Sequence, residues 1–263
     1  MSKKLNGKPN LSIFGGVNLN HYVLNTIAFK NWLDDGASQA DLVLKTKNLG
    51  FNFVEIRNEF LDGNSAELAK IKASADSAGI GVYYSVNDPL IKDGKVNTDI
   101  DRYISEMKVL GSSHLKMNIG NMDNISSSFA DDLKEKISTN SELEFNVENN
   151  QTLEESKLEN IVAFFKLVDK SKLPIGFCFD TANWYWTESE PNKAAEQLAS
   201  VTKYLHLKNK SGTGNSKSVT SLDKGEIDIK PLISKFNVNE YGFEYAAPFV
   251  EIEHDLNEIK TLN

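Results

Sequence analysis

The sequence predicts an α/β fold, a single (β/α)8 TIM barrel that takes up residues 1–263. Short segments rich in β-branched and aromatic residues recur along the chain, and each is followed by a stretch with helical periodicity. This unit of about 33 residues recurs eight times in ~250 residues, which is the repeat expected of such a barrel. An open, doubly wound sheet is the alternative. Its dinucleotide-binding form has little support, because GGVNLN follows the first candidate strand in place of G-x-G-x-x-G.

Eight segments are expected to form the barrel strands, because each combines β-branched and aromatic residues over the length of a strand. In chain order they are LSIFGGV from residue 11, FNFVEIR from 51, GVYYSVN from 81, HLKMNIG from 114, LEFNVEN from 143, GFCFDTAN from 176, KYLHLKN from 203 and PFVEIEHD from 248.

Amphipathic segments lie between these strands and are expected to be helices. Four of them cover residues 65–79, 98–111, 126–138 and 152–171. Gly50, Gly79 and Gly111 follow periodic stretches and are predicted stop signals, because glycine adopts the left-handed conformation without a Cβ clash. Thr152 and Glu155 have the spacing of a capping box and are expected to open the last of the four helices.

The composition excludes some classes of function. With 29 Lys and Arg against 37 Asp and Glu, the formal net charge is -8, so attraction to a nucleic-acid backbone cannot be the main binding force. The one cysteine, Cys178, permits neither an internal disulfide nor a Cys-rich zinc site, which indicates a reducing compartment. No signal peptide follows the basic N-terminus, and no run approaches the ~18 apolar residues of a membrane span. We therefore expect a cytoplasmic protein without membrane or nucleic-acid partners.

Polar residues lie late in four consecutive predicted strands. They are Glu148 on the fifth strand, Asp180 on the sixth, His206 on the seventh and Glu251 on the eighth. In a barrel of this kind the carboxyl ends of the strands form one mouth, where catalytic residues normally lie. Three carboxylates brought together there would repel one another unless a cation lay between them. The set suits one hard divalent ion, with Mn2+ expected first and Mg2+, Co2+ or Zn2+ as alternatives.

The same residues lie in segments that resemble a known family. VENN around Glu148, FDTANW around Asp180, YLHLKN around His206 and FVEIEHD around Glu251 are similar to the xylose-isomerase-like TIM-barrel superfamily. Its members include sugar and sugar-phosphate isomerases and epimerases, among them the ketose 3-epimerases, and also the keto-inositol dehydratases. The resemblance covers nearly the whole chain.

The resemblance implies a metal-dependent isomerase or epimerase that acts on a ketose or ketose phosphate through a cis-enediolate. By match, the four residues would hold the metal, and Glu148 and Glu251 would be the acid/base pair that removes and returns a proton on opposite faces. The chemistry needs a Lewis acid, because a proton beside a ketone is weakly acidic until the enediolate charge is stabilised. Two carboxylates permit inversion, whereas one base would return the proton to the same face. Family members are frequently dimers or tetramers.

Six further residues are candidate substrate contacts: Glu154, Asn183, Trp184, Trp186, Lys208 and His21. Glu154 lies where epimerases of the family place a second acid, although a dipole-favoured charge in the first helical turn is an equal alternative. Asn183 departs from the His of many members and is similar to the sugar-phosphate 3-epimerase branch. Trp184 and Trp186 could stack on a sugar or pack against a neighbouring loop.

The remaining candidates follow from their places in the predicted strands. Lys208 shares a strand face with His206 and could hold a substrate oxygen or neutralise a carboxylate. His21 is expected in the loop after the first strand, within reach of substrate. Glu55 and Arg57 share another strand face and are expected to form a buried ion pair.

The sequence leaves other activities to be weighed. A lyase such as a keto-inositol dehydratase would start from the same metal-bound enolate. A barrel that only binds a sugar would keep the residue types without turnover. The apurinic-endonuclease branch of the superfamily uses many histidines to hold several metal ions, whereas this chain has 4 histidines and an acidic composition, which argues against a nuclease.

Overall fold

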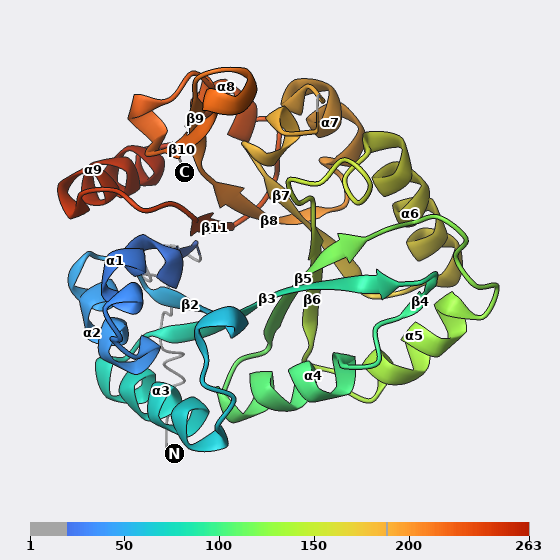
Figure 1. Cartoon of the computed structure of the whole chain (residues 1–263), viewed down its shortest axis with the longest axis horizontal. Coiled ribbons are helices and arrows are strands. Elements are labelled where there is room, and N and C mark those ends of the chain that lie inside the picture. The colour runs from blue at the N-terminus through green and yellow to red at the C-terminus, as the bar shows by residue number, and fades with distance from the viewer. Residues whose placement is uncertain (1–19, 188, 263) are drawn as a thin grey trace, which may run out of the picture.

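Parallel strands close into an eight-stranded barrel in the computed structural model, which describes residues 20–187 and 189–262 (Figure 1). The barrel strands are β1 (His21–Asn25), β2 (Phe53–Arg57), β3 (Gly81–Lys92), β5 (His114–Gly120), β6 (Glu144–Glu148), β7 (Ile175–Asp180), β8 (Thr202–Leu207) and β11 (Glu240–Phe243). Each strand pairs in parallel with the next barrel strand in the chain, and β11 pairs with β1 to close the ring. The predicted barrel is therefore confirmed.

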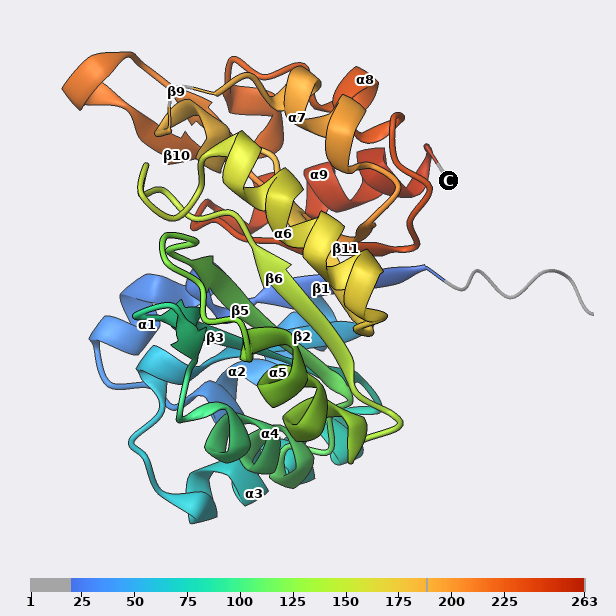
Figure 2. The ribbon, with the colours of Figure 1, turned by 90° about the vertical axis from the view of Figure 1, so that its right-hand side faces the viewer.

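A helix follows each barrel strand and lies on the outside of the ring (Figures 1 and 2). These helices are α2 (Gln39–Asn48), α3 (Ser65–Ala78), α4 (Ile100–Val109), α5 (Phe129–Ser138), α6 (Leu158–Ser171), α7 (Pro191–Leu198), α8 (Ile229–Ile233) and α9 (Phe249–Lys260). Smaller elements occupy the connections: α1 (Lys30–Asp34), β4 (Lys95–Val96), the hairpin of β9 (Asn209–Ser211) and β10 (Ser218–Thr220), and short 3-10 turns. Across residues 20–187 and 189–262, no helix combines the length and apolar character needed to cross a membrane.

The apolar side chains divide between two cores. The larger core fills the space between the strands and the surrounding helices. A smaller cluster lies inside the barrel and consists of Val23, Tyr83, Cys178 and Tyr204, with Phe53 packed against it.

Inside the barrel, four aromatic rings form a continuous column. The rings of His114 and Tyr83 are stacked with centroids 3.8 Å apart, and those of Tyr83 and Tyr204 are 5.3 Å apart. The ring of Tyr204 lies 4.8 Å from that of His206. His114 begins β5 and His206 lies near the end of β8, so the column links the two ends of the barrel.

Most predicted elements are confirmed, with boundaries shifted by a few residues. Gly79 caps α3 in the left-handed conformation, with φ 64°. The predicted capping box is wrong: α6 begins at Leu158, while Thr152 and Glu155 lie in the loop before it, around Asn150. The segment from residue 11, predicted as the first strand, lies outside the described residues. The first described strand begins at His21, so this histidine is not in the loop that follows a strand.

The predicted eighth strand is also wrong, because residues from Phe249 onward form α9. Its buried residues Ile252, Leu256 and Ile259 recur at spacings of four and three, which is helical periodicity. The last barrel strand is β11, where Gly242 faces the interior. A Cβ at this position would lie 2.1 Å from the Tyr204 hydroxyl, so the glycine makes room for the ring column.

Candidate active site at the carboxyl ends of the strands

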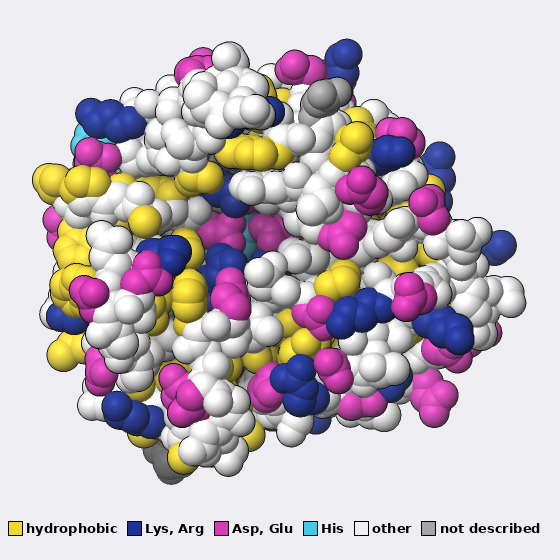
Figure 3. Space-filling model, in the orientation of Figure 1, with side chains coloured by type: hydrophobic (Ala, Val, Ile, Leu, Met, Phe, Trp, Pro, Cys, Tyr) yellow, Lys and Arg dark blue, Asp and Glu magenta, His cyan; other side chains and the backbone are white. Residues whose placement is uncertain are grey.

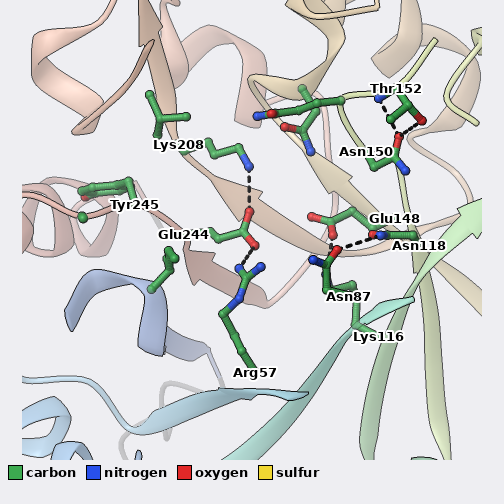
Figure 4. Close-up of a pocket in the computed structure, with 15 residues that line it drawn as sticks. Arg57, Asn87, Lys116, Asn118, Glu148, Asn150, Thr152, Lys208, Glu244 and Tyr245 are labelled. Carbon is green, nitrogen blue, oxygen red and sulfur yellow. Dashed lines mark hydrogen bonds and ion pairs between the residues drawn. The ribbon is translucent and has the colours of Figure 1, made fainter. Parts of the chain in front are cut away.

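A cavity of about 530 Å³ opens at the carboxyl ends of the barrel strands. Its lining carries charged side chains from five strands: Arg57 ends β2, Lys116 lies on β5, Glu148 ends β6, Lys208 follows β8 and Glu244 follows β11. In the space-filling view the hollow exposes acidic side chains beside Lys and Arg (Figure 3). The close-up shows these side chains converging from their separate strands (Figure 4).

Four buried side chains at this mouth form a group with the composition of a metal site. They are Glu148, Asp180, His206 and Glu244, and one ligand atom from each lies within 4.8 Å of the others. The fold brings them together because β6, β7, β8 and β11 are consecutive neighbours, with Asp180 directly opposite His206 in the register. Three of the four residues predicted from the sequence are therefore brought together.

The fourth predicted residue, Glu251, is not in this group, and its place is taken by Glu244. Glu251 lies in the first turn of α9, where its carboxylate accepts a hydrogen bond from Ser221 at 2.6 Å. The prediction depended on a strand at 248, and that strand is a helix. Glu244 instead follows β11 and is 8% exposed.

His206 lies at the centre of the group, fully buried between carboxylates. Its Nδ1 is 2.6 Å from Glu148 Oε1 and 3.5 Å from Glu244 Oε2, while its Nε2 is 3.0 Å from Glu55 Oε2. Burial alone would lower the pKa of the imidazole, but Cys178 and the carboxylates on both sides outweigh it and raise the pKa of His206 well above its ordinary value. Glu55 thus places a negative charge beside the ring, and it is not part of the cavity lining.

Two buried lysines and an arginine neutralise the same carboxylates. Lys116 Nζ contacts Glu148, and Lys208 Nζ lies 2.9 Å from Asp180 Oδ2 and 2.7 Å from Glu244 Oε2. Arg57 approaches the other oxygen of Glu244, with its NH1 2.7 Å from Oε1. The ion pair expected between Glu55 and Arg57 is therefore absent among these contacts. Glu55 pairs with His206 instead, and Arg57 pairs with Glu244.

These contacts give the carboxylates different acidities. Burial raises the pKa of Glu148, but Lys116 and His206 outweigh it and bring the value down to about 2. For Asp180 burial is the stronger influence, and with the nearby Glu244 it raises the pKa to about 6 despite Lys208. Glu148 is therefore held as an anion, whereas Asp180 keeps its proton to a higher pH than Glu148 does.

The donor set fits a divalent ion. Three carboxylates and one imidazole are the ligands that Mn2+, Mg2+, Co2+ or Zn2+ accept. A carboxylate beside the second ring nitrogen is common for a metal-bound histidine, and Glu55 Oε2 lies 3.0 Å from Nε2 of His206. The ammonium groups of Lys116 and Lys208 contact three of the four ligands, so an ion here would share its carboxylates with two lysines.

Comparison with known proteins identifies the family. A family model described as the xylose isomerase-like TIM barrel matches residues 43–260, which is most of the chain. The chain belongs to this family. No curated protein gives a significant match to this xylose isomerase-like barrel.

Solved structures share its fold at low sequence identity. D-psicose 3-epimerase from Clostridium cellulolyticum H10 is 14% identical, with a TM-score of 0.65 over 92% of this chain and 99% of that chain. An L-ribulose 3-epimerase is 18% identical, with a TM-score of 0.64 over 92% and 94% of the two chains. A probable 3-DHS dehydratase from Bacillus anthracis is 13% identical, with a TM-score of 0.61 over 92% and 99%. At these sequence identities the similarity shows a shared fold and no more.

Two of the six predicted substrate contacts line the cavity of this xylose isomerase-like barrel, namely Asn183 and Lys208. Asn183 is held by its own amide groups: the backbone N–H donates to Asp180 Oδ1 at 2.7 Å, and Nδ2 donates to the Asn149 carbonyl at 2.8 Å. Its Oδ1 is buried without a hydrogen-bond partner among the described residues, which leaves it available to a substrate hydroxyl.

The other four predicted contacts lie elsewhere. Trp184 is fully buried in the outer core, 5.3 Å from the ring of Phe179, and Trp186 packs against the same core. Glu154 is exposed in the loop between β6 and α6, outside the cavity lining. His21 begins β1 and therefore lies at the opposite end of the barrel from the mouth.

Lys116 and Glu244 are the charged residues of the cavity lining that were not predicted from the sequence. On β5 every second residue, His114, Lys116 and Asn118, is polar and faces the interior, and this alternation was a usable signal. Glu240, Gly242 and Glu244 alternate with Tyr241 and Phe243 in the same way, but the glycine and the acidic residues weaken the resemblance to a strand.

Proposed function

We propose that the protein is a divalent-metal-dependent isomerase or epimerase that acts on a ketose or ketose phosphate by proton transfer through a cis-enediolate. The observation that carries the proposal is the pair of buried carboxylates, Glu148 and Glu244, which reach the cavity from β6 and from the end of β11. The epimerases among the similar structures support the same class of reaction.

The metal would be held by Glu148, Asp180, His206 and Glu244, with Mn2+ as the first candidate. When bound, it would stabilise the negative charge that develops on the substrate oxygens as the proton leaves.

Glu148 and Glu244 would exchange protons with the substrate carbon from two sides. A base must be ionised before it can accept a proton, and the contacts of Lys116 with Glu148 and of Lys208 with Glu244 favour that state. The pKa of Glu244 is lowered well below its ordinary value, because Lys208 and His206 outweigh its burial. With one carboxylate on each side of the reacting carbon, the proton can be removed from one face and returned to the other.

Lys208 and Asn183 would position the substrate. Both line the cavity, and each presents a polar group to it: the ammonium of Lys208 as a donor and Oδ1 of Asn183 as an acceptor. A row of hydroxyl and carbonyl oxygens on a sugar can use both. Arg57 holds Glu244 in place through its NH1 and is in turn bonded to Glu59.

The test is proton NMR of a panel of ketoses and ketose phosphates incubated in D2O with the Mn2+-loaded protein. We expect deuterium to enter at the carbon beside the carbonyl while an epimer or aldose appears. Glu148→Gln and Glu244→Gln should each abolish the exchange. Glu251→Gln is the matched control and should keep it, because this carboxylate lies on α9 and bonds to Ser221. Full exchange in Glu244→Gln would refute the acid/base assignment.

A metal-dependent lyase is the second candidate, favoured by the probable dehydratase among the similar structures. Elimination of water from a β-hydroxy ketone would begin with the same abstraction of the proton beside the carbonyl by a carboxylate at the mouth. The same NMR experiment separates the two activities, because a lyase would show exchange followed by loss of water.

A further inference from the structure

A second polar cluster lies at the amino-terminal end of the barrel, away from the mouth. His21, His114 and Glu240 are each the first residue of a strand, in β1, β5 and β11. His21 and Glu240 are direct neighbours in the register of β1 and β11, and β5 brings His114 to them. One ligand atom from each of the three residues lies within 4.8 Å of the others.

Two polar atoms of this cluster are buried without a partner. His114 is 8% exposed and Glu240 is 7% exposed, yet His114 Nε2 and Glu240 Oε2 have no hydrogen-bond partner among the described residues. The nearest acidic atoms to His114 Nε2 are Glu144 Oε2 at 3.2 Å and Glu240 Oε1 at 3.7 Å. Buried polar atoms nearly always have a hydrogen bond. Two such atoms without a hydrogen bond in one cluster, His114 Nε2 and Glu240 Oε2, therefore point to a missing ligand.

The other ring nitrogens of the two histidines are already engaged. Nδ1 of His21 lies 2.7 Å from the Tyr83 hydroxyl, and Nδ1 of His114 lies 3.3 Å from Ser113 Oγ. The His114 ring is further fixed by stacking on Tyr83 at 3.8 Å. A hydrogen bond on one nitrogen that orients the other is the usual support of a metal-bound histidine.

We infer that His21, His114 and Glu240 form a binding site for a transition-metal ion of the Zn2+ class. Two imidazoles and one carboxylate are ligands that Zn2+, Co2+ and Ni2+ prefer, in contrast to the oxygen-rich set at the mouth. A cavity of about 580 Å³, lined by His21, Glu144 and Glu240, gives an ion access from outside. The ion would tie together the starts of three strands, and residues at this end of a TIM barrel generally serve stability.

The test is uptake of Co2+ by the chelator-treated full chain, followed by equilibrium dialysis and by the visible absorption of the bound ion. We expect His114→Gln to lose one equivalent of Co2+ relative to the wild type. Glu135→Gln is the control, because Glu135 is exposed on α5 and belongs to none of the candidate ligand clusters, and it should lose none. Tyr83→Phe should keep the site but weaken its affinity about 10- to 100-fold, since it removes the hydroxyl that holds His21 and also interacts with Glu240.

This test of the second metal site is independent of the proposed function. Glu148→Gln alters only the cluster at the mouth, so the equivalent of Co2+ bound by His21, His114 and Glu240 should remain. Unchanged uptake by His114→Gln would overturn the inference, as would a wild type that binds no Co2+ beyond the ion removed by Glu148→Gln. If His114→Gln does not melt cooperatively, Glu240→Gln is tested in its place, because glutamine keeps the shape of the Glu240 side chain. This variant should also lose one equivalent of Co2+.

Discussion

Lys116 shows, at the scale of one residue, how the negative charge at the mouth of the barrel is neutralised. Its ammonium contacts Glu148 within a buried pair, so replacement by methionine removes the stronger of the two cationic partners of this carboxylate and leaves only His206. Removing one partner of such a pair typically costs about 3–5 kcal/mol. We expect Lys116→Met to lower the free energy of unfolding by this order, measured by urea denaturation. Lys136→Met is the control: it breaks a surface pair with Asp101 and should cost less than about 1 kcal/mol. Equal losses would contradict a buried, paired role for Lys116.

Glu148 also predicts how stability depends on pH. The pKa of Glu148 is about 2 in the folded protein against an ordinary value of 4.5, so the folded state favours the ionised form. This contribution is fully present above pH 4.5 and is lost as the pH falls toward 2; it amounts to about 3 kcal/mol. We expect the free energy of unfolding of Glu148→Gln to fall less steeply than that of the wild type between these values. Parallel curves would show that Glu148 is not held as an anion.

At the scale of the element, β11 depends on a glycine. A Cβ on Gly242 would lie 2.1 Å from the hydroxyl of Tyr204 and 2.8 Å from Cδ2 of His206. Gly242→Ala should therefore destabilise the protein by about 1–3 kcal/mol, the usual cost of overpacking a core. Tyr204→Phe removes the nearest atom, so the double variant should recover part of the loss in thermal melts. A double variant as unstable as the sum of both changes would argue against this contact as the cause.

The elements also show what the sequence could predict and what it could not. Six of the predicted strands and their helices are confirmed, because each has buried apolar residues at strand or helix spacing. The segment from 248 failed because Phe249, Val250 and Ile252 give a short stretch a strand-like composition, while its longer periodicity is helical. With that strand misplaced, Glu251 was selected in place of Glu244. The polar alternation of β5 indicates that Lys116 faces the interior, but its role depends on a contact with Glu148, which lies 32 residues further along the chain.

At the scale of the whole molecule, the barrel should not require the metal at its mouth in order to fold. A chain of this length buries about three quarters of the surface that its unfolded form exposes. The carboxylates at the mouth already have Lys116, Lys208 and Arg57 as partners. Treatment with EDTA should therefore abolish the proposed activity but leave a cooperative thermal transition. Loss of that transition after chelation would show that the ions are needed for the fold.

The ring column inside the barrel has a consequence for how this architecture can vary. The ring of His114 packs on Tyr83 and the ring of His206 packs on Tyr204. Because Tyr83 and Tyr204 contact each other, the histidines at the two ends are connected through these two rings. Replacing His114 or His206 leaves the contact between Tyr83 and Tyr204 intact, so the polar residues at one end can change without altering those at the other. Loss of the Tyr204 ring would instead remove a neighbour of both Tyr83 and His206, so the middle of the barrel tolerates less change than either end.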